Sequence, residues 1–153
     1  MKKFKFQLET LLKVTKSKKE EAEIKFAEAS RKVEELRAQL QVFLAEMQAG
    51  QREYEALTAE GAKVTIGTLM IYNDFINWKR QQIERQQQLI LEARAFRQKC
   101  LDELLKLMNK LKSIEQLKEK RFRQYQAEAL AEEQKMLDEI GLQLTMRNAK
   151  PGD

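Results

Sequence analysis

The fold is decided by residues 8–57, which read LETLLKVTKSKKEEAEIKFAEASRKVEELRAQLQVFLAEMQAGQREYEAL. Alternate steps of four and three residues from Leu8 give fifteen positions, and twelve of them are apolar, without any shift of frame. Seven heptads of this kind indicate a coiled coil rather than an ordinary amphipathic helix. The positions of this seam are Leu8, Leu12, Thr15, Lys19, Ala22, Phe26, Ala29, Val33, Leu36, Leu40, Phe43, Met47, Gly50, Tyr54 and Leu57.

A second tract follows the same rule over residues 69–114, where eleven of fourteen seam positions are apolar. Cys100 is one of them, and we expect a small buried hydrophobic residue there rather than a reactive thiol. The charged and amide seam residues are expected to fix the register or to extend their polar ends out of the seam. The full seam is Leu69, Tyr72, Ile76, Lys79, Ile83, Gln86, Ile90, Ala93, Arg97, Cys100, Leu104, Leu107, Leu111 and Ile114.

Only a short connection separates the two tracts, and it carries turn and cap residues. Gly61 suits a left-handed helix C-cap, and Thr65 or Thr68 suits the next N-cap. A short connection between long helices favours antiparallel packing. The sequence therefore predicts an all-α fold, a single long antiparallel two-helix coiled coil (an αα-hairpin) over residues 1–153. Its expected parts are a helix at about 5–58, a turn at 59–67, a helix at 68–144 and a frayed tail at 145–153.

The second arm is longer than the first, so its end should lie beyond its partner. Leu8 is expected to face the neighbourhood of Leu117, and the second seam loses its frame after Ile114. Apolar residues then shift to other faces, at Phe122, Tyr125, Ala129 and Met136 and at Leu130, Leu137, Ile140 and Leu144. We therefore expect a C-terminal helical overhang whose apolar faces have a partner outside the chain.

Composition excludes several classes of function. The chain has no His, a single Cys and 35% charged residues. Without imidazoles, a Cys–base pair or a cavity, an enzyme or a metal or cofactor site is not expected. Apolar runs of about four residues are too short to span a membrane. Lys5, Gln7 and Glu9 interrupt any signal-peptide core, which predicts a cytoplasmic protein in a reducing compartment.

Positive charge is concentrated in two segments that the hairpin would bring side by side. Residues 1–19 carry a net charge of +6 and residues 106–123 a net charge of +5, whereas the whole chain carries +5. Such an end suits an acidic protein surface, such as the collar of a ring, or nucleic acid. Solvated coiled-coil flanks are the third interpretation. The candidate residues are Lys13, Lys16, Lys18, Lys120, Arg121 and Arg123, with Phe122 and Tyr125 on the overhang.

Four of the eleven aromatic residues lie within about two turns of the connection. Tyr54 and Tyr72 occupy seam positions and are expected to pack there. Phe75 and Trp78 lie outside the seam and should face water, where large apolar side chains are typical partner anchors.

Three segments resemble the flagellar export protein FliJ family. Phe4-Lys5-Phe6-Gln7-Leu8-Glu9-Thr10-Leu11-Leu12 is similar to the F-x-F-x-L-x-x-L-L start of many members. Tyr72-Asn73-Asp74-Phe75-Ile76 resembles the Y-x-x-F-I segment that opens their second helix. Glu133-Gln134-Lys135-Met136-Leu137-Asp138-Glu139, followed by Met146-Arg147, is similar to their acidic C-terminal segment.

The resemblance implies a non-enzymatic stalk of the flagellar type III export apparatus, located in the cytoplasm and peripheral to the inner face of the cell membrane. Such a stalk binds the hexameric export ATPase FliI and the export gate protein FlhA, and promotes assembly of the ATPase ring. Family members are also described as escorting export chaperones. The family's gate-binding surface lies near the hairpin tip and carries over to Tyr54 and Phe75, and by a looser match to Met47.

We therefore expect the basic end and overhang to meet the ATPase and the aromatic tip to meet the gate. A structural tethering coiled coil, an injectisome stalk protein and a basic nucleic-acid-binding coiled coil are the alternatives. They differ in stimulation of an ATPase and in the salt dependence of binding.

Overall fold

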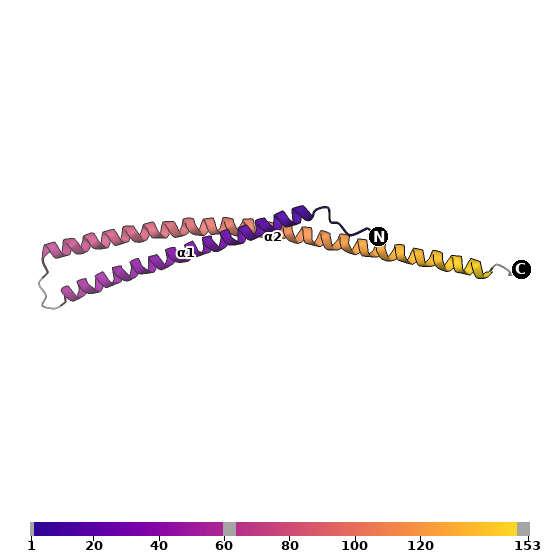
Figure 1. Cartoon of the computed structure of the whole chain (residues 1–153). Coiled ribbons are helices and arrows are strands. Elements are labelled where there is room, and N and C mark those ends of the chain that lie inside the picture. The colour runs from indigo at the N-terminus through magenta and orange to yellow at the C-terminus, as the bar shows by residue number, and fades with distance from the viewer. Residues whose placement is uncertain (1, 60–63, 150–153) are drawn as a thin grey trace. The chain divides into compact units, whose positions relative to one another are not determined.

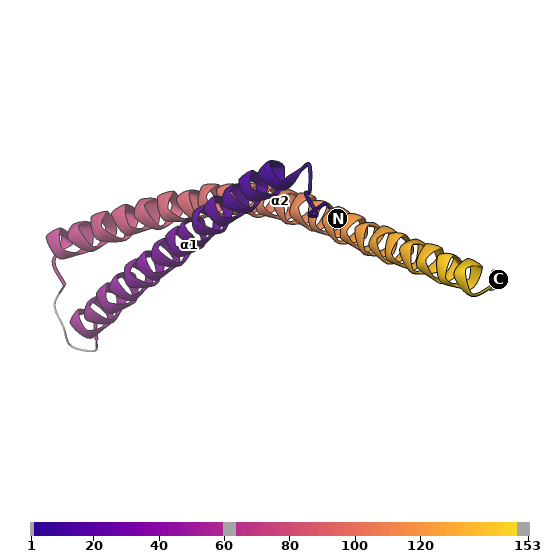
Figure 2. The same cartoon turned by 45° about the vertical axis from the view of Figure 1, so that its right-hand side comes forward.

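The structure, a computed structural model, describes residues 2–59 and 64–149 and consists there of two helices, α1 (Glu9–Leu57) and α2 (Ile66–Ala149), with no strand in those ranges. The two helices pack against each other in antiparallel fashion (Figures 1 and 2). This confirms the predicted all-α two-helix coiled coil. Backbone contacts group the chain into unit 1 (Met1–Lys19 with Leu107–Asp153) and unit 2 (Glu20–Lys106), each built from a segment of both helices.

α2 begins two residues before the predicted start, and its first turn shows why. The backbone amide of Thr68 donates a hydrogen bond to the Thr65 hydroxyl at 3.2 Å, and the two hydroxyls lie 2.9 Å apart. Thr65 is thus the N-cap, and it satisfies one amide that has no partner inside the helix. The predicted C-cap at Gly61 lies outside the described residues.

The other end of α2 reaches Ala149, so the prediction of a frayed tail from residue 145 was wrong for residues 145–149. Arg147 lies in the last turn, where a cation interacts favourably with the helix dipole.

The N-terminal segment corrects a second boundary, because α1 begins at Glu9 rather than at residue 5. Residues 2–6 are not helical, and the ring of Phe6 is buried against unit 1. Side chains two residues apart share one face of an extended chain, whereas on a helix they point about 200° apart. Phe4 and Phe6 can therefore both contact α2 only if the segment stays extended.

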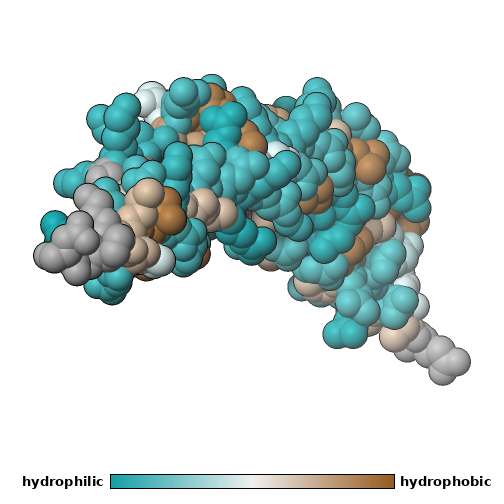
Figure 3. Space-filling model, turned by 90° about the vertical axis from the view of Figure 1, so that its right-hand side faces the viewer, coloured by the Kyte–Doolittle hydropathy of each residue, from teal (hydrophilic) through white to brown (hydrophobic). Residues whose placement is uncertain are grey.

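The interior of unit 2 is the predicted seam. Val33 is fully buried, and Ala29, Ile76, Ile90 and Cys100 are also buried along the seam. Cys100 is thus the small buried hydrophobic residue that the heptad frame indicated. The face seen in Figure 3 is mostly hydrophilic, with hydrophobic side chains in small separate groups.

Two polar seam residues of unit 2 are buried, and both have partners. The Lys79 ammonium forms an ion pair with Glu46, donates to Gln82 Oε1 at 3.2 Å and lies 5.4 Å from the centre of the Phe43 ring. The Gln86 side-chain amide donates to the Leu36 carbonyl at 2.9 Å. Because such groups are costly to bury without partners, these bonds favour one register over its alternatives.

Unit 1 keeps the same antiparallel register. Thr15, Leu111 and Ile114 are buried, and Leu8 and Leu117 are half-buried. One residue further along each helix, Glu9 and Lys118 form an ion pair at 2.9 Å. The expectation that Leu8 faces the neighbourhood of Leu117 is thereby confirmed.

None of the helices in the described ranges combines the length and the hydropathy that crossing a membrane requires.

We predict that replacing either partner of the seam ion pair changes the stability by a different amount. Glu46→Ala leaves the Lys79 ammonium without its carboxylate and should lower the free energy of unfolding by about 1–2 kcal/mol. This is less than for a fully buried pair, because Glu46 keeps contact with water. Lys79→Met replaces the charge by an apolar side chain of similar length and should change stability by less than about 1 kcal/mol.

Urea unfolding of the two variants, beside the exposed control Glu55→Ala, measures these differences. Equal stabilities of Glu46→Ala and Glu55→Ala would contradict a structural role for the pair.

Candidate partner-binding surfaces

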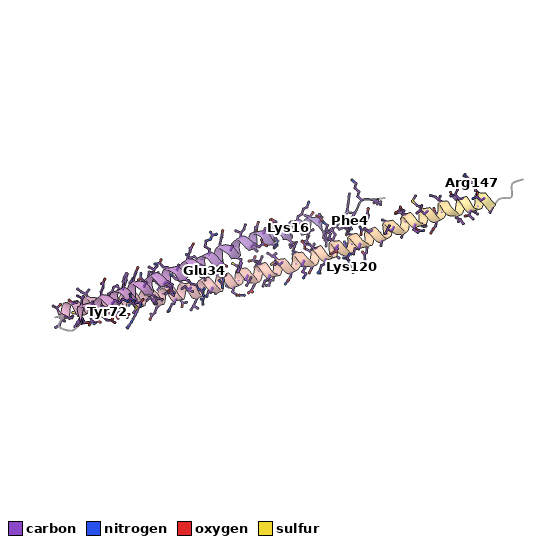
Figure 4. All side chains as sticks on the ribbon, turned by 90° about the horizontal axis from the view of Figure 1, so that it is seen from below. Phe4, Lys16, Glu34, Tyr72, Lys120 and Arg147 are labelled. Atoms are coloured by element: carbon purple, nitrogen blue, oxygen red, sulfur yellow. The ribbon has the colours of Figure 1, made fainter. Side chains whose placement is uncertain are left out.

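Unit 1 holds the basic candidate surface. Its α1 segment presents Lys13, Lys16 and Lys18, and all three side chains are exposed. The α2 segment of the same unit adds Lys120, which is also exposed. Figure 4 labels Lys16 on α1 and Lys120 on α2, both within unit 1. The structure thus brings the two basic segments of the sequence into one unit, as the antiparallel register requires.

Two arginines of this surface are engaged within the chain. Arg123 Nη2 donates to Glu119 Oε1 at 2.6 Å, in an ion pair with the residue one helical turn before it. The Arg121 guanidinium lies 5.9 Å from the centre of the Phe6 ring, at the limit of a cation–π contact. A shallow groove runs beside them on α2 and is lined by Gln116, Glu119, Lys120, Arg123, Gln124 and Ala127. The lysines are therefore the more available charges for an external partner.

The N-terminal segment covers part of the predicted overhang surface. The Phe4 ring packs edge-on against Phe122, with ring centres 5.2 Å apart, and against Tyr125 at 5.5 Å. The Tyr125 hydroxyl donates to the Lys2 carbonyl at 2.7 Å. Figure 4 shows Phe4 beside α2, beyond the start of α1. Phe122 and Tyr125 are thus partly occupied by the chain itself, which the assumption of a helical start at residue 5 had concealed.

The aromatic residues near the connection belong to unit 2. Tyr54 and Tyr72 stack on each other with ring centres 3.8 Å apart, as their seam positions indicated. Trp78 is 56% exposed, which agrees with its expected orientation toward water. Its ring lies 4.9 Å from the Lys79 ammonium. Met47 is a half-buried seam residue.

Phe75 departs from the expectation that it faces water. It is half-buried, and its ring lies directly over Gly50 of α1, where an added Cβ would overlap the ring. The missing side chain at Gly50 therefore creates the space that Phe75 fills. The signal was present in the sequence as a glycine within an unbroken helical seam, where glycine often marks a close approach.

A shallow apolar groove results at this end of unit 2. It is lined by Gly50, Glu53, Tyr54, Leu57, Thr68, Ile71, Tyr72 and Phe75. Ile71, at 73% exposed, was missed by the sequence analysis because it lies outside the heptad frame. The groove combines apolar walls with one carboxylate, which suits an apolar side chain of a partner.

Beyond Tyr125, α2 has no packing partner among the described residues. Every residue from Leu130 to Ala149 is exposed. This segment, residues 126–149, is called the overhang below.

We predict that Gly50 and Phe75 are energetically coupled. In a Phe75→Ala background, Gly50→Ala should stabilise the chain by about 1 kcal/mol, because alanine favours the helix and meets no obstacle. With Phe75 present, the new methyl group must displace the ring, and most of that gain should disappear. A double-mutant cycle followed by urea unfolding measures the coupling, expected at about 1 kcal/mol. Additive effects would show that the ring does not occupy the space over Gly50.

Comparison with known proteins identifies a family. The family model described as "Flagellar FliJ protein" matches residues 4–150 of the 153. Neither a search of curated proteins nor a search of solved structures finds a significant match. The matched range includes the extended Phe4–Phe6 segment and both helices, with the whole overhang. The chain therefore belongs to the family of the flagellar FliJ protein, the non-enzymatic stalk components of flagellar type III protein export.

Proposed function

We propose that this chain couples the export ATPase FliI to the export gate protein FlhA. The basic surface of unit 1 binds the ATPase and promotes assembly of its ring, and the groove and Trp78 in unit 2 bind the gate. Export chaperones are a further class of partner for the same protein. Through these partners the chain acts in the cytoplasm, at the inner face of the cell membrane.

The observation that carries the ATPase assignment is the exposure of four lysines in one unit, contributed by both arms. Lys13, Lys16, Lys18 and Lys120 are exposed, and none of them forms an ion pair with a carboxylate in the part of the chain that the structure describes. Concentrated like charge destabilises a fold, so its retention suits an acidic partner surface.

The gate assignment rests on apolar surface that the chain leaves exposed near the connection. Ile71 and Trp78 are 73% and 56% exposed and do not contribute to the seam. Large apolar side chains of this kind are typical binding anchors. Tyr54, Tyr72 and Phe75 shape the groove through their mutual packing and the Gly50 contact, so they position the surface as well as line it.

The structure allows a sharper experiment than substitution of every candidate residue. Lys13→Glu/Lys16→Glu/Lys18→Glu/Lys120→Glu reverses charge without changing Arg121 or Arg123, which have contacts within the chain. Ile71→Ala/Trp78→Ala removes exposed apolar surface without breaking the Tyr54–Tyr72 stack. Pull-down of purified ATPase and of the cytoplasmic part of the gate should then separate the two sites.

We expect the charge variant to lose ATPase binding by more than tenfold and to keep gate binding, because its lysines lie outside unit 2. The apolar variant should show the reverse. Matched controls in unit 2 are Arg31→Glu/Lys32→Glu/Arg52→Glu/Lys99→Glu for charge and Phe96→Ala for an exposed ring.

Loss of gate binding in the lysine variant, with ATPase binding intact, would reverse the assignment. Retention of both partners by both variants would favour a simple tether. Binding of the lysine-rich surface to duplex nucleic acid with a steep salt dependence would favour the nucleic-acid alternative.

A further inference from the structure

The overhang carries an apolar stripe in a heptad frame of its own. Leu130, Leu137, Ile140 and Leu144 are between 51% and 66% exposed. Leu130, Leu137 and Leu144 are seven residues apart and occupy equivalent heptad positions. The second position of each heptad, three residues further on, is occupied by Glu133, Ile140 and Arg147. A stripe with this period is the seam of a coiled coil that lacks its second helix.

The missing helix is not α1. The frame that packs α2 against α1 passes through Ile114 and Lys118 and would continue at Glu132 and Lys135. The stripe lies one or two residues further on, which turns it by at least about 100° around the helix axis. α1 therefore could not cover the stripe even if it extended further.

The polar residues that interrupt the stripe indicate which kind of helix would pack against it. Glu133 and Arg147 have opposite charge and lie on either side of the central Leu137 and Ile140. If two copies pair in parallel, Glu133 faces Glu133 and Arg147 faces Arg147, and like charges in a seam oppose association. If they pair antiparallel with Leu137 opposite Ile140, each glutamate lies in the layer next to the arginine of the other copy, about 4.5 Å away along the axis. The two glutamates are then separated by roughly 16 Å.

We propose that the overhang binds a second copy of this chain as an antiparallel coiled coil. Leu137 of each copy packs against Ile140 of the other, which places Glu133 opposite Leu144 and one layer, about 4.5 Å along the axis, from Arg147 of the other copy. The pattern is self-complementary, as a two-fold interface requires. This inference is independent of the proposed function.

The shape of the overhang fits this register. A shallow groove on α2 is lined by Ile140, Gln143, Leu144, Met146 and Arg147. With Leu137 opposite Ile140, Leu130 of the second copy arrives opposite Arg147, next to this groove. Each copy would then insert one leucine into the groove of the other, as knobs pack into holes in a coiled coil.

Charge exchange in the full-length chain tests both the pairing and its direction. Glu133→Arg places two arginines in adjacent layers at each end of an antiparallel dimer and should raise the dissociation constant roughly tenfold. Glu133→Arg/Arg147→Glu restores opposite charges and should return the constant to the value of the unchanged chain. In a parallel dimer the exchange would only replace one like-charge pair by another, and neither variant would weaken it.

Sedimentation equilibrium over micromolar to near-millimolar concentrations gives these constants, and circular dichroism verifies that each variant keeps its helices. Glu128→Arg is the matched control, because it makes the same change in charge on the opposite side of the overhang. Leu137→Asp should abolish the dimer, with a loss of at least about a hundredfold, because two buried leucines are replaced at its centre.

A monomer at every concentration would overturn the proposal. So would a dimer that survives Leu137→Asp, since it would form through another face. Equal constants for Glu133→Arg and Glu128→Arg, or no recovery in the double variant, would rule out the antiparallel register. ATPase and gate pull-downs are separate measurements, so failure here leaves the proposed function standing or falling on its own.

Discussion

The structure depends on the burial of one narrow apolar seam between two antiparallel helices. A two-helix coiled coil has no other interior, so every seam residue affects both stability and register. Val33, Ile90 and Cys100 exclude water, whereas Lys79 and Gln86 are tolerated because Glu46 and the Leu36 carbonyl satisfy them. The apolar residues provide most of the stabilisation, and the two polar contacts make misaligned pairings costly. The lysine surface and the apolar groove are both formed by residues of the two helices, and this register brings those residues together.

The architecture could be predicted from the sequence because heptads are a local and repeated signal. Leu8 and Leu117, far apart in sequence, were matched by counting back from the connection, and the Glu9–Lys118 ion pair agrees. The helix ends were harder to predict from the sequence. Phe4 and Phe6 gain more by packing against α2 in an extended segment than by prolonging α1, and a tertiary contact of this kind leaves only a weak trace in the local sequence.

The candidate surfaces were predicted in part. Exposure of Lys13, Lys16, Lys18 and Trp78 followed from their positions outside the seam. The half-buried position of Phe75 could not be predicted in this way, because it depends on the absence of a side chain at Gly50 on the other helix. The hydrogen bond of Tyr125 could not be predicted either, because its acceptor is the carbonyl of Lys2 in the N-terminal segment. A heptad analysis treats each helix separately. It therefore cannot find contacts of this kind, between segments of the chain that are far apart in sequence.

The two proposals use different surfaces. The ATPase contact uses exposed lysines on both arms of unit 1, whereas the second copy covers the apolar stripe of the overhang. The stripe is turned away from the α1-facing seam, so neither partner needs to disturb the hairpin. The antiparallel register of the hairpin brings the lysines of both arms into one unit, whereas the proposed dimer depends on the stripe of the overhang alone.

That register can be measured on the unmodified chain with a zero-length carbodiimide, which joins a carboxylate to an amine only when the two are in contact. Mass spectrometry of digests should find Glu9 joined to Lys118 and Glu103 joined to Lys25, whose charged groups lie 2.9 and 4.0 Å apart. Low protein concentration keeps the products intramolecular. Glu9 joined to Lys79 instead would contradict the antiparallel hairpin on which this account rests.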